Sequence, residues 1–149
     1  LADLVRVADK EVGGSGFEVG PSETWGACDR ESGINWGDPT SPASPCGAYF
    51  PVVVAQPATR VEGGLGQGIL VALGPLELAG NFAFKGVVFA RGQVTVRDHA
   101  SVAGTVLSED TVRVVEAGRI DRSRCAVSRA LAASARPFGV PTRSWSRNP

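Results

Sequence analysis

Residues 86–104 read GVVFARGQVTVRDHASVAG, and this stretch contains one full period of a repeat that governs the middle of the chain. A glycine or an acidic residue stands at every sixth position, at Gly68, Gly74, Gly80, Gly86, Gly92, Asp98, Gly104, Asp110 and Glu116. Between these positions, the same two slots of each hexad hold apolar residues in all cases except Ser108 and Gly118. Self-similarity at a fixed period is typical of repeat architectures.

Two inward residues separated by one outward residue form a short strand, because successive side chains on a strand point to opposite faces. The glycine of each hexad allows the chain to bend there, so three hexads close one triangular coil of 18 residues. We therefore predict an all-β fold: a single-stranded parallel β-solenoid (a triangular β-helix with 18 residues per coil), with a long inserted loop and a C-terminal capping α-helix. The alternative is an antiparallel sheet with irregularly spaced hairpins. The pattern leaves the handedness open.

The length of 149 residues suits one domain with its own core. We predict that 1–19 forms a first coil or edge strands and that 20–64 is a loop rich in Pro, Gly and cysteine. Three coils are expected at 65–121, the capping helix at 122–137 and a tail at 138–149. Within the first segment, Leu4–Lys10 resembles Gln93–His99, which predicts a strand. Within the loop, the apolar run Tyr49–Val54 is expected to return the chain to the solenoid as a strand.

The C-terminal segment Ser123–Arg136 is rich in Ala and Arg and ends before Pro137, as a helix does. Ala126, Val127, Ala130, Leu131 and Ser134 have the spacing of one helical face. We expect this helix to cover the open end of the last coil, because an uncapped solenoid exposes apolar side chains and strand edges.

The cysteines indicate an oxidising compartment. Cys28 and Cys46 bracket a Pro-rich segment, and a disulfide between them would contribute about 3 kcal/mol through loop-closure entropy. No cysteine or histidine cluster with zinc-ligand spacing accompanies them. We therefore predict an extracytoplasmic location. For Cys125 we expect a buried thiol, and the alternative is a bond to a part of the protein outside this chain.

The chain begins at Leu1 without Met and carries no apolar run long enough for a membrane span or a signal peptide. We expect it to be a fragment or a processed product. Fifteen basic and fifteen acidic residues balance each other, so no bulk charge attracts nucleic acid, and no nucleic-acid partner is expected. The C-terminal arginines could meet an acidic partner or DNA, although a solvated helix face is favoured.

Catalytic groups are not recognisable in the sequence. The carboxylates of the repeat lie on different sides of the triangle, and the single histidine, His99, is expected to be a solvated corner residue rather than a general base. The glycines of Gly66–Gly68 already belong to corners and do not indicate a phosphate loop. We therefore expect no enzyme activity, no cofactor and no metal site.

One side of the triangle is apolar on the outside as well. Its outward slots hold Ile69, Val71, Val87, Phe89 and Leu107, and such a patch must be covered. Either the cysteine loop or the C-terminal helix folds over it, or it is an interaction surface for another subunit.

Two family resemblances follow from these residues. The hexad run from Gly86 to Ile120 looks like the β-helix of bactofilins, which polymerise end to end. A fuller resemblance is to the C-terminal part of PilX-type pilus-assembly proteins of type IV pilus systems. It is carried by GQGILV at 66–71, GNFAFKGVV at 80–88, CAVSRAL at 125–131 and RSW at 143–145. This resemblance implies a surface-exposed domain preceded by a pilin-like helix and a leader, and no catalytic residues are carried over.

The expected function is thus a non-enzymatic structural or interaction domain of a type IV pilus-associated surface protein, acting in pilus assembly or surface contact. Its partners would be pilin-like proteins or further copies, bound through the apolar side, with membrane attachment only through a segment upstream of Leu1. One alternative is a bactofilin-like self-polymerising scaffold. Another is a carbohydrate-binding adhesin or carbohydrate-processing enzyme whose groove would contain Trp25, Trp36 and Tyr49.

Overall fold

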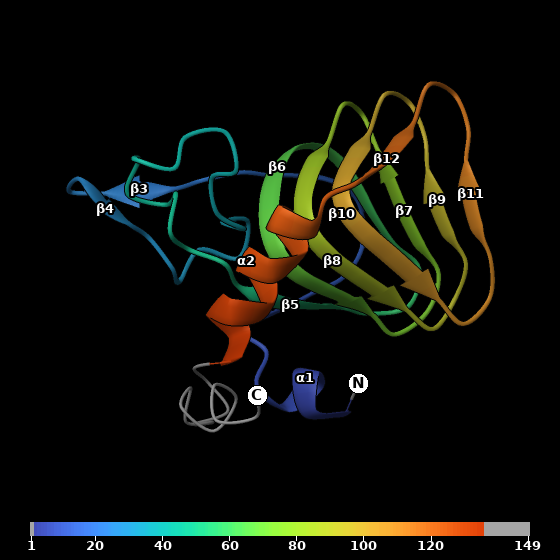
Figure 1. The fold of residues 1–149 in the computed structure, drawn as a ribbon, viewed down its shortest axis with the longest axis horizontal. Helices are drawn as coiled ribbons and strands as arrows, with labels where there is room; N and C mark the ends of the chain where they lie inside the picture. The colour runs from blue at the N-terminus through green and yellow to red at the C-terminus, as the bar shows by residue number, and fades with distance from the viewer. Residues whose placement is uncertain (1, 136–149) are drawn as a thin grey trace.

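The computed structural model describes residues 2–135 and confirms the solenoid (Figure 1). Its strands stack coil upon coil in parallel ladders, and the one antiparallel pair in the described chain is a small hairpin. The period is the predicted one, because Leu76 pairs with Val94 and Val94 pairs with Val112, each 18 positions further along.

Each coil has three sides. Side one contains β1 (Lys10–Val12), β5 (Val52–Ala55) and the C-terminal parts of β6 (Thr59–Ala72), β8 (Ala83–Ala90) and β10 (Ser101–Ser108). Side two contains β2 (Ser15–Val19), the start of β6, β7 (Leu76–Ala79), β9 (Val94–Val96) and β11 (Val112–Val114). Side three contains the middle of β6, the first halves of β8 and β10, and β12 (Arg119–Arg122).

The corner between sides three and one depends on a column of glycines. Gly68, Gly86 and Gly104 have φ angles of 108°, 143° and 146°, which L side chains rarely adopt. A Cβ on Gly86 would lie 2.0 Å from the carbonyl oxygen of Gly68, and a Cβ on Gly104 would lie 1.9 Å from that of Gly86. The coils can therefore approach to strand-pairing distance at this corner only without side chains.

The corner between sides two and three uses two consecutive residues with positive φ in each coil. Asp98 and His99 fill it in the coil after Gly80 and Asn81, with φ angles of 52° and 64°. Short polar side chains tolerate this region better than branched ones. The expectation that an acidic residue replaces glycine at a corner is confirmed at Asp98.

The inward residues of the hexads form the main core. Leu70, Leu78, Val88 and Val96 are each fully buried there. A line of aromatic rings extends this core toward its N-terminal end, through contacts of Phe17 with Trp36, Trp36 with Phe82 and Phe82 with Phe84. The core thus continues into the first coil.

The N-terminal segment differs from the prediction. The strand predicted over residues 4–10 is replaced by a short helix, α1 (Ala2–Arg6), and the predicted first coil begins only at Lys10, with β1 and β2. Leu4, Val5 and Ala8 pack against the apolar outer face of side one, and Ala, Leu and Arg in this segment favour a helix. The solenoid also begins earlier than position 65, because the chain returns from the loop in β5, as the apolar run predicted, and enters β6 at Thr59.

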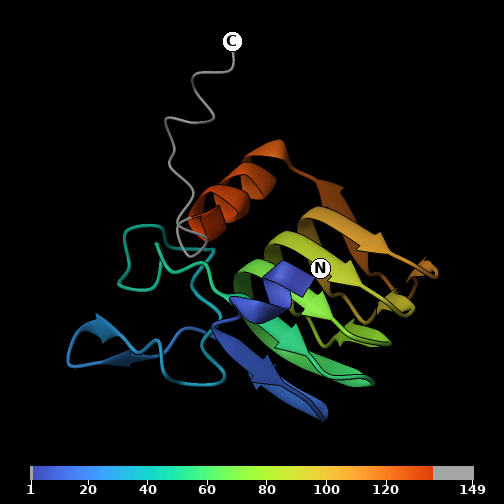
Figure 2. The same cartoon turned by 90° about the horizontal axis from the view of Figure 1, so that it is seen from below.

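The C-terminal helix α2 (Arg124–Ala135) exists as predicted but lies elsewhere. It packs against β6, β8 and β10 on the outside of side one instead of covering the end of the last coil (Figure 2). The expected stop at Pro137 and the tail 138–149 lie outside the described residues. Burial of the outer apolar face explains the position of α2, since Ala130 is 1% exposed there and Val127 packs beside it. Leu131 does not share that burial and is 47% exposed.

Replacing Gly86 with Ala should destabilise the fold by roughly 2–4 kcal/mol, because the new methyl group meets the Gly68 carbonyl and the φ angle is unfavourable. Chemical unfolding measures this change. The matched control is Gly33→Ala, where a Cβ meets nothing within 4 Å and the cost should stay within about 0.5 kcal/mol. Equal stabilities of the two variants would show that the glycine column does not constrain the coils.

Candidate functional site: the cysteine loop and the ends of the solenoid

The cysteine loop, residues 20–51, enters the core. The amide of Gly20 donates to the Ile34 carbonyl at 2.8 Å, and the amide of Gln67 donates to the Trp36 carbonyl at 2.8 Å. Trp36 is fully buried against Phe17 and Phe82. The segment around Trp36 therefore supplies the third side of the first coil and closes the N-terminal end of the core.

The predicted Cys28–Cys46 disulfide is present and joins the two arms of this loop. Asn35, which is fully buried, lies beside it. Its Nδ2 lies 2.7 Å from the Asp29 carbonyl oxygen and 3.2 Å from the Ser22 carbonyl oxygen, with both cysteine sulfurs within 3.4 Å. One buried amide and one covalent bond thus hold four otherwise irregular segments together.

Gln67 holds the second arm. Its side chain is 3% exposed, and Nε2 lies 2.9 Å from the Tyr49 carbonyl oxygen, 3.1 Å from that of Gly47 and 3.3 Å from that of Cys46. The run Gly66–Gly68 therefore anchors the loop to the solenoid. The sequence contained no signal for this role beyond an apolar strand interrupted by one glutamine.

Asp38 is a buried acid of the loop. The carboxylate accepts hydrogen bonds from the Thr40 amide (3.1 Å), the Thr40 hydroxyl (2.9 Å) and the Ser44 hydroxyl (2.9 Å). Burial alone would raise the pKa of Asp38, but these bonds and one from the Ser41 amide favour the anion and leave the pKa below its ordinary value. The charge of Asp38 thus stabilises the turn that follows it.

Tyr49 and Lys10 join the loop to the first coil. Lys10 Nζ donates to the Arg30 carbonyl at 2.6 Å, and the Arg30 guanidinium lies 4.8 Å from the Tyr49 ring centroid. Burial, with Asp9 adding to it and Arg30 opposing it, raises the pKa of Tyr49 to about 12. Burial also lowers the pKa of Lys10, against the opposing charges of Asp9 and Asp29. The Arg30 guanidinium therefore makes a cation–π contact with the Tyr49 ring.

A two-stranded hairpin projects from the loop, formed by β3 (Glu23–Thr24) and β4 (Ala27–Cys28). Its turn residues Trp25 and Gly26 both have positive φ, 56° and 76°, as a type I′ turn requires. Trp25 is 99% exposed, whereas Trp36 and Tyr49 are buried. The three aromatic residues proposed for a sugar groove therefore do not share a surface.

The apolar interaction surface predicted on side one is covered within the chain. Ile69, Val71 and Val87 are at most 2% exposed, and Phe89 packs in the same cluster. The C-terminal helix covers this face, as one of the two alternatives predicted, and α1 packs beside it. Of the five predicted residues, Leu107 is 49% exposed and Phe89 is partly buried.

The C-terminal end of the solenoid is open in the described chain. Within residues 2–135, β11 pairs only with β9 and β12 only with β10. Val112 and Val114, which are 41% and 45% exposed, occupy the columns that are buried in the preceding coils. At the other end Trp36 fills the core, although β1 and β2 also pair with one strand each within residues 2–135.

An open groove of about 660 Å³ lies between α2 and the last coils. We call it the arginine groove, and its lining residues are Gly104, Thr105, Arg122, Ser123, Arg124, Val127 and Ser128. Arg122 and Arg124 are exposed, and neither forms an ion pair within residues 2–135. No carboxylate lines the groove, so its rim is positively charged.

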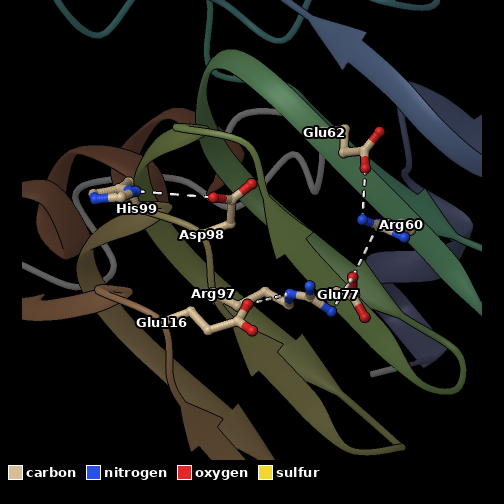
Figure 3. A network of polar contacts seen from close by, with 7 residues as sticks. All are labelled: Arg60, Glu62, Glu77, Arg97, Asp98, His99 and Glu116. Carbon is tan, nitrogen blue, oxygen red and sulfur yellow. Dashed lines mark ion pairs between the residues drawn. The ribbon is translucent and has the colours of Figure 1, made fainter.

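A ladder of charges runs across side two (Figure 3). Arg97 Nε lies 2.9 Å from Glu116 Oε2, and Arg97 Nη1 lies 3.6 Å from Glu77 Oε2, which Arg60 Nε approaches to 2.9 Å. Glu77 and Glu116 were expected on different sides of the triangle, but Arg97 contacts both of them. Arg60 and Glu77 are register partners on adjacent strands. Partly exposed ion pairs of this kind each contribute little to the free energy of unfolding. The ladder is therefore a structural feature of the surface.

His99 is a solvated corner residue, as expected, with its Nδ1 3.8 Å from Asp98 Oδ1 and its side chain 67% exposed. Among the described residues, no three histidine, cysteine or acidic side chains are grouped to hold a metal ion. No described helix is long and apolar enough to cross a membrane.

Cys125 differs from the prediction of a buried thiol, because it is free and exposed in the first turn of α2. The helix turns its small residues Ala126 and Ala130 toward the solenoid, and this leaves Cys125 on the other side. A pocket of about 90 Å³ lies there, lined also by Lys85 and Arg129.

Compared with family models, curated proteins and solved structures, the chain shows no significant match.

Replacing Asp38 with Asn should lower the free energy of unfolding at pH 7 by about 1.5–3 kcal/mol, the range for hydrogen bonds to a charged group. Because the pKa of Asp38 is lowered by folding, its stabilisation is complete above the unfolded pKa and is lost as the pH falls through the folded value. Unfolding curves recorded from pH 7 down to about pH 2 should therefore converge for the two proteins. A difference that stays constant over this range would contradict the assignment.

Proposed function

We propose that the chain is a non-enzymatic, extracytoplasmic interaction domain of a surface protein that acts with a type IV pilus system, in assembly or surface contact. The observation that carries this proposal is the disulfide-held loop that closes one end of a rigid parallel solenoid. A cross-link of this kind persists in oxidising compartments. The scaffold presents a projecting hairpin, an arginine groove and an open end, all of which suit contact with other proteins.

The pilus association is supported by the four sequence motifs that resemble PilX-type proteins. Two of these, 66–71 and 80–88, form strands of the solenoid around the loop anchor Gln67, and the third, 125–131, lies in α2. The fourth, 143–145, lies outside the described residues. The motifs therefore coincide with the elements that join loop, solenoid and helix.

A self-polymerising scaffold is the second candidate, and the uncapped edge of β11 and β12 favours it. Filament growth by stacking of cores would need two open ends. At the other end β1 and β2 also keep an unpaired edge within residues 2–135, but the buried Trp36 fills the core there, which favours the interaction domain over the polymer.

Replacing Cys28 and Cys46 together with Ser should lower the free energy of unfolding by about 3 kcal/mol, since the disulfide closes a loop of 18 positions. Guanidinium unfolding measures it. Cys125→Ser is the matched control and should unfold like the parent chain, because that thiol is free and exposed. A double variant as stable as the control would show that the disulfide does not hold the loop.

The location and the pilus role are tested in cells that make the natural protein. After rapid alkylation, nonreducing mass spectrometry should find Cys28 and Cys46 joined and Cys125 alkylated. A reduced pair in the alkylated cells would overturn the extracytoplasmic location. Deleting the segment that encodes residues 2–135 should reduce the number of pili per cell, counted by electron microscopy, or attachment to surfaces. Unchanged pili and attachment would overturn the pilus role.

A further inference from the structure

Trp25 stands at a position that is unfavourable for a tryptophan in two respects, its backbone angle and its exposure. The first residue of a type I′ turn has positive φ and is usually Asn, Asp or Gly, and Trp25 adopts 56° there. Its large apolar side chain is also 99% exposed. A residue held in a sparsely populated conformation at a surface is a reason to infer a function, and tryptophan is enriched among the residues that dominate protein contacts.

The base of the hairpin is fixed. Cys28, at the end of β4, is bonded to Cys46, and the Asp29 amide donates to the Ser22 carbonyl at 2.7 Å across the two strands. The side-chain amide of the buried Asn35 also donates to the carbonyl oxygens of Ser22 and Asp29. The indole is therefore presented on a rigid support, which lowers the entropy cost of binding.

We propose that the Trp25 hairpin (residues 23–28) of one copy inserts into the arginine groove of a second copy of the chain. An indole and a guanidinium attract each other through a cation–π contact. Arg122 and Arg124 rim the groove without internal ion pairs in the described chain. The groove, of about 660 Å³, is open to solvent.

Charge complementarity selects a second copy as the partner. The hairpin and its base carry Glu23, Asp29 and Glu31 against one basic residue, Arg30, which is turned onto the Tyr49 ring. The groove has two arginines and no carboxylate. Carboxylate and guanidinium pairs guide such surfaces together and fix their orientation.

The contact is heterologous, because the two surfaces are different parts of the chain. Figure 1 shows the β3–β4 hairpin at the end of the molecule away from β12, so each copy can use its hairpin and its groove at once. Contacts of this type form rings or open chains. A hairpin of six residues buries less than the roughly 1,200 Å² of stable interfaces, so the association is weak and reversible.

This inference rests on the proposed function only in treating the chain as an interaction domain. Self-association is measured by sedimentation velocity on the purified, oxidised chain at low and high salt. Concentrations from about 10 µM to about 1 mM cover the range expected of weak contacts. The average mass should rise with concentration and fall with added salt. Trp25→Ala and the double variant Arg122→Glu/Arg124→Glu should each weaken association at least tenfold.

Mixing the two variants gives the decisive result. Trp25→Ala keeps its groove, and Arg122→Glu/Arg124→Glu keeps its hairpin. An equimolar mixture should therefore form a heterodimer, although each variant alone stays monomeric. Two controls should associate like the parent chain: Ile34→Ala, which removes another exposed apolar residue of the loop, and Arg113→Glu, which alters the open end at β11. Unchanged thermal unfolding of the variants verifies their fold.

A parent chain that stays monomeric up to the highest concentration would overturn the proposal. So would association that survives Trp25→Ala, association that is lost with Arg113→Glu, or a mixture that does not restore the dimer. None of these outcomes touches the disulfide state in cells or the pilus count, so failure of this contact is distinguishable from failure of the proposed function.

Discussion

The close approach of stacked backbones at Gly68, Gly86 and Gly104 is the constraint on which the rest of the structure depends. A Cβ at Gly86 or Gly104 would lie at or below 2.0 Å from the carbonyl oxygen of the preceding coil. With glycine at each level, the coils pair strand by strand on all three sides, and the inward Leu, Val and Phe side chains meet their equivalents in the neighbouring coils. Stability is then a property of neighbouring coils rather than of long-range packing.

Such a stack leaves each terminal coil with one unpaired face, and the two ends of this solenoid differ in how far their inward side chains are buried. At the N-terminal end, an irregular insertion returns to the core through Trp36 and is fixed by Asn35, Gln67 and the Cys28–Cys46 disulfide. At the other end, the inward residues Val112 and Val114 remain partly exposed. Helix α2 does not cover them, because it packs on the apolar outer face of side one formed by Ile69, Val71 and Val87.

Much of this could be predicted from sequence because the hexad repeat is a local pattern. The slots of Leu76, Val94 and Val112 gave the period, and the spacing of Cys28 and Cys46 gave the disulfide. The parts that could not be predicted depend on contacts between distant segments. Trp36 looks like one of several scattered loop aromatics until its pairing with Gln67 is known. The short helix α1 was missed because Leu4–Lys10 resembles the repeat segment Gln93–His99, although Ala, Leu and Arg favour a helix. The position of α2 was missed because helical periodicity identifies an apolar face but not the surface that it covers.

Of the features suited to contact, the hairpin lies in the loop that the disulfide fixes, whereas the groove and the open end lie at the last coils. Hydrogen–deuterium exchange on the oxidised and the reduced chain tests whether the loop closes the N-terminal end of the core. Reduction should remove protection first from β1, β2 and the amide of Gln67, while β8 and β10 stay protected, because local opening starts where contacts are lost. Equal loss of protection in all coils, or no loss in the first, would contradict the closure of the solenoid by the cysteine loop.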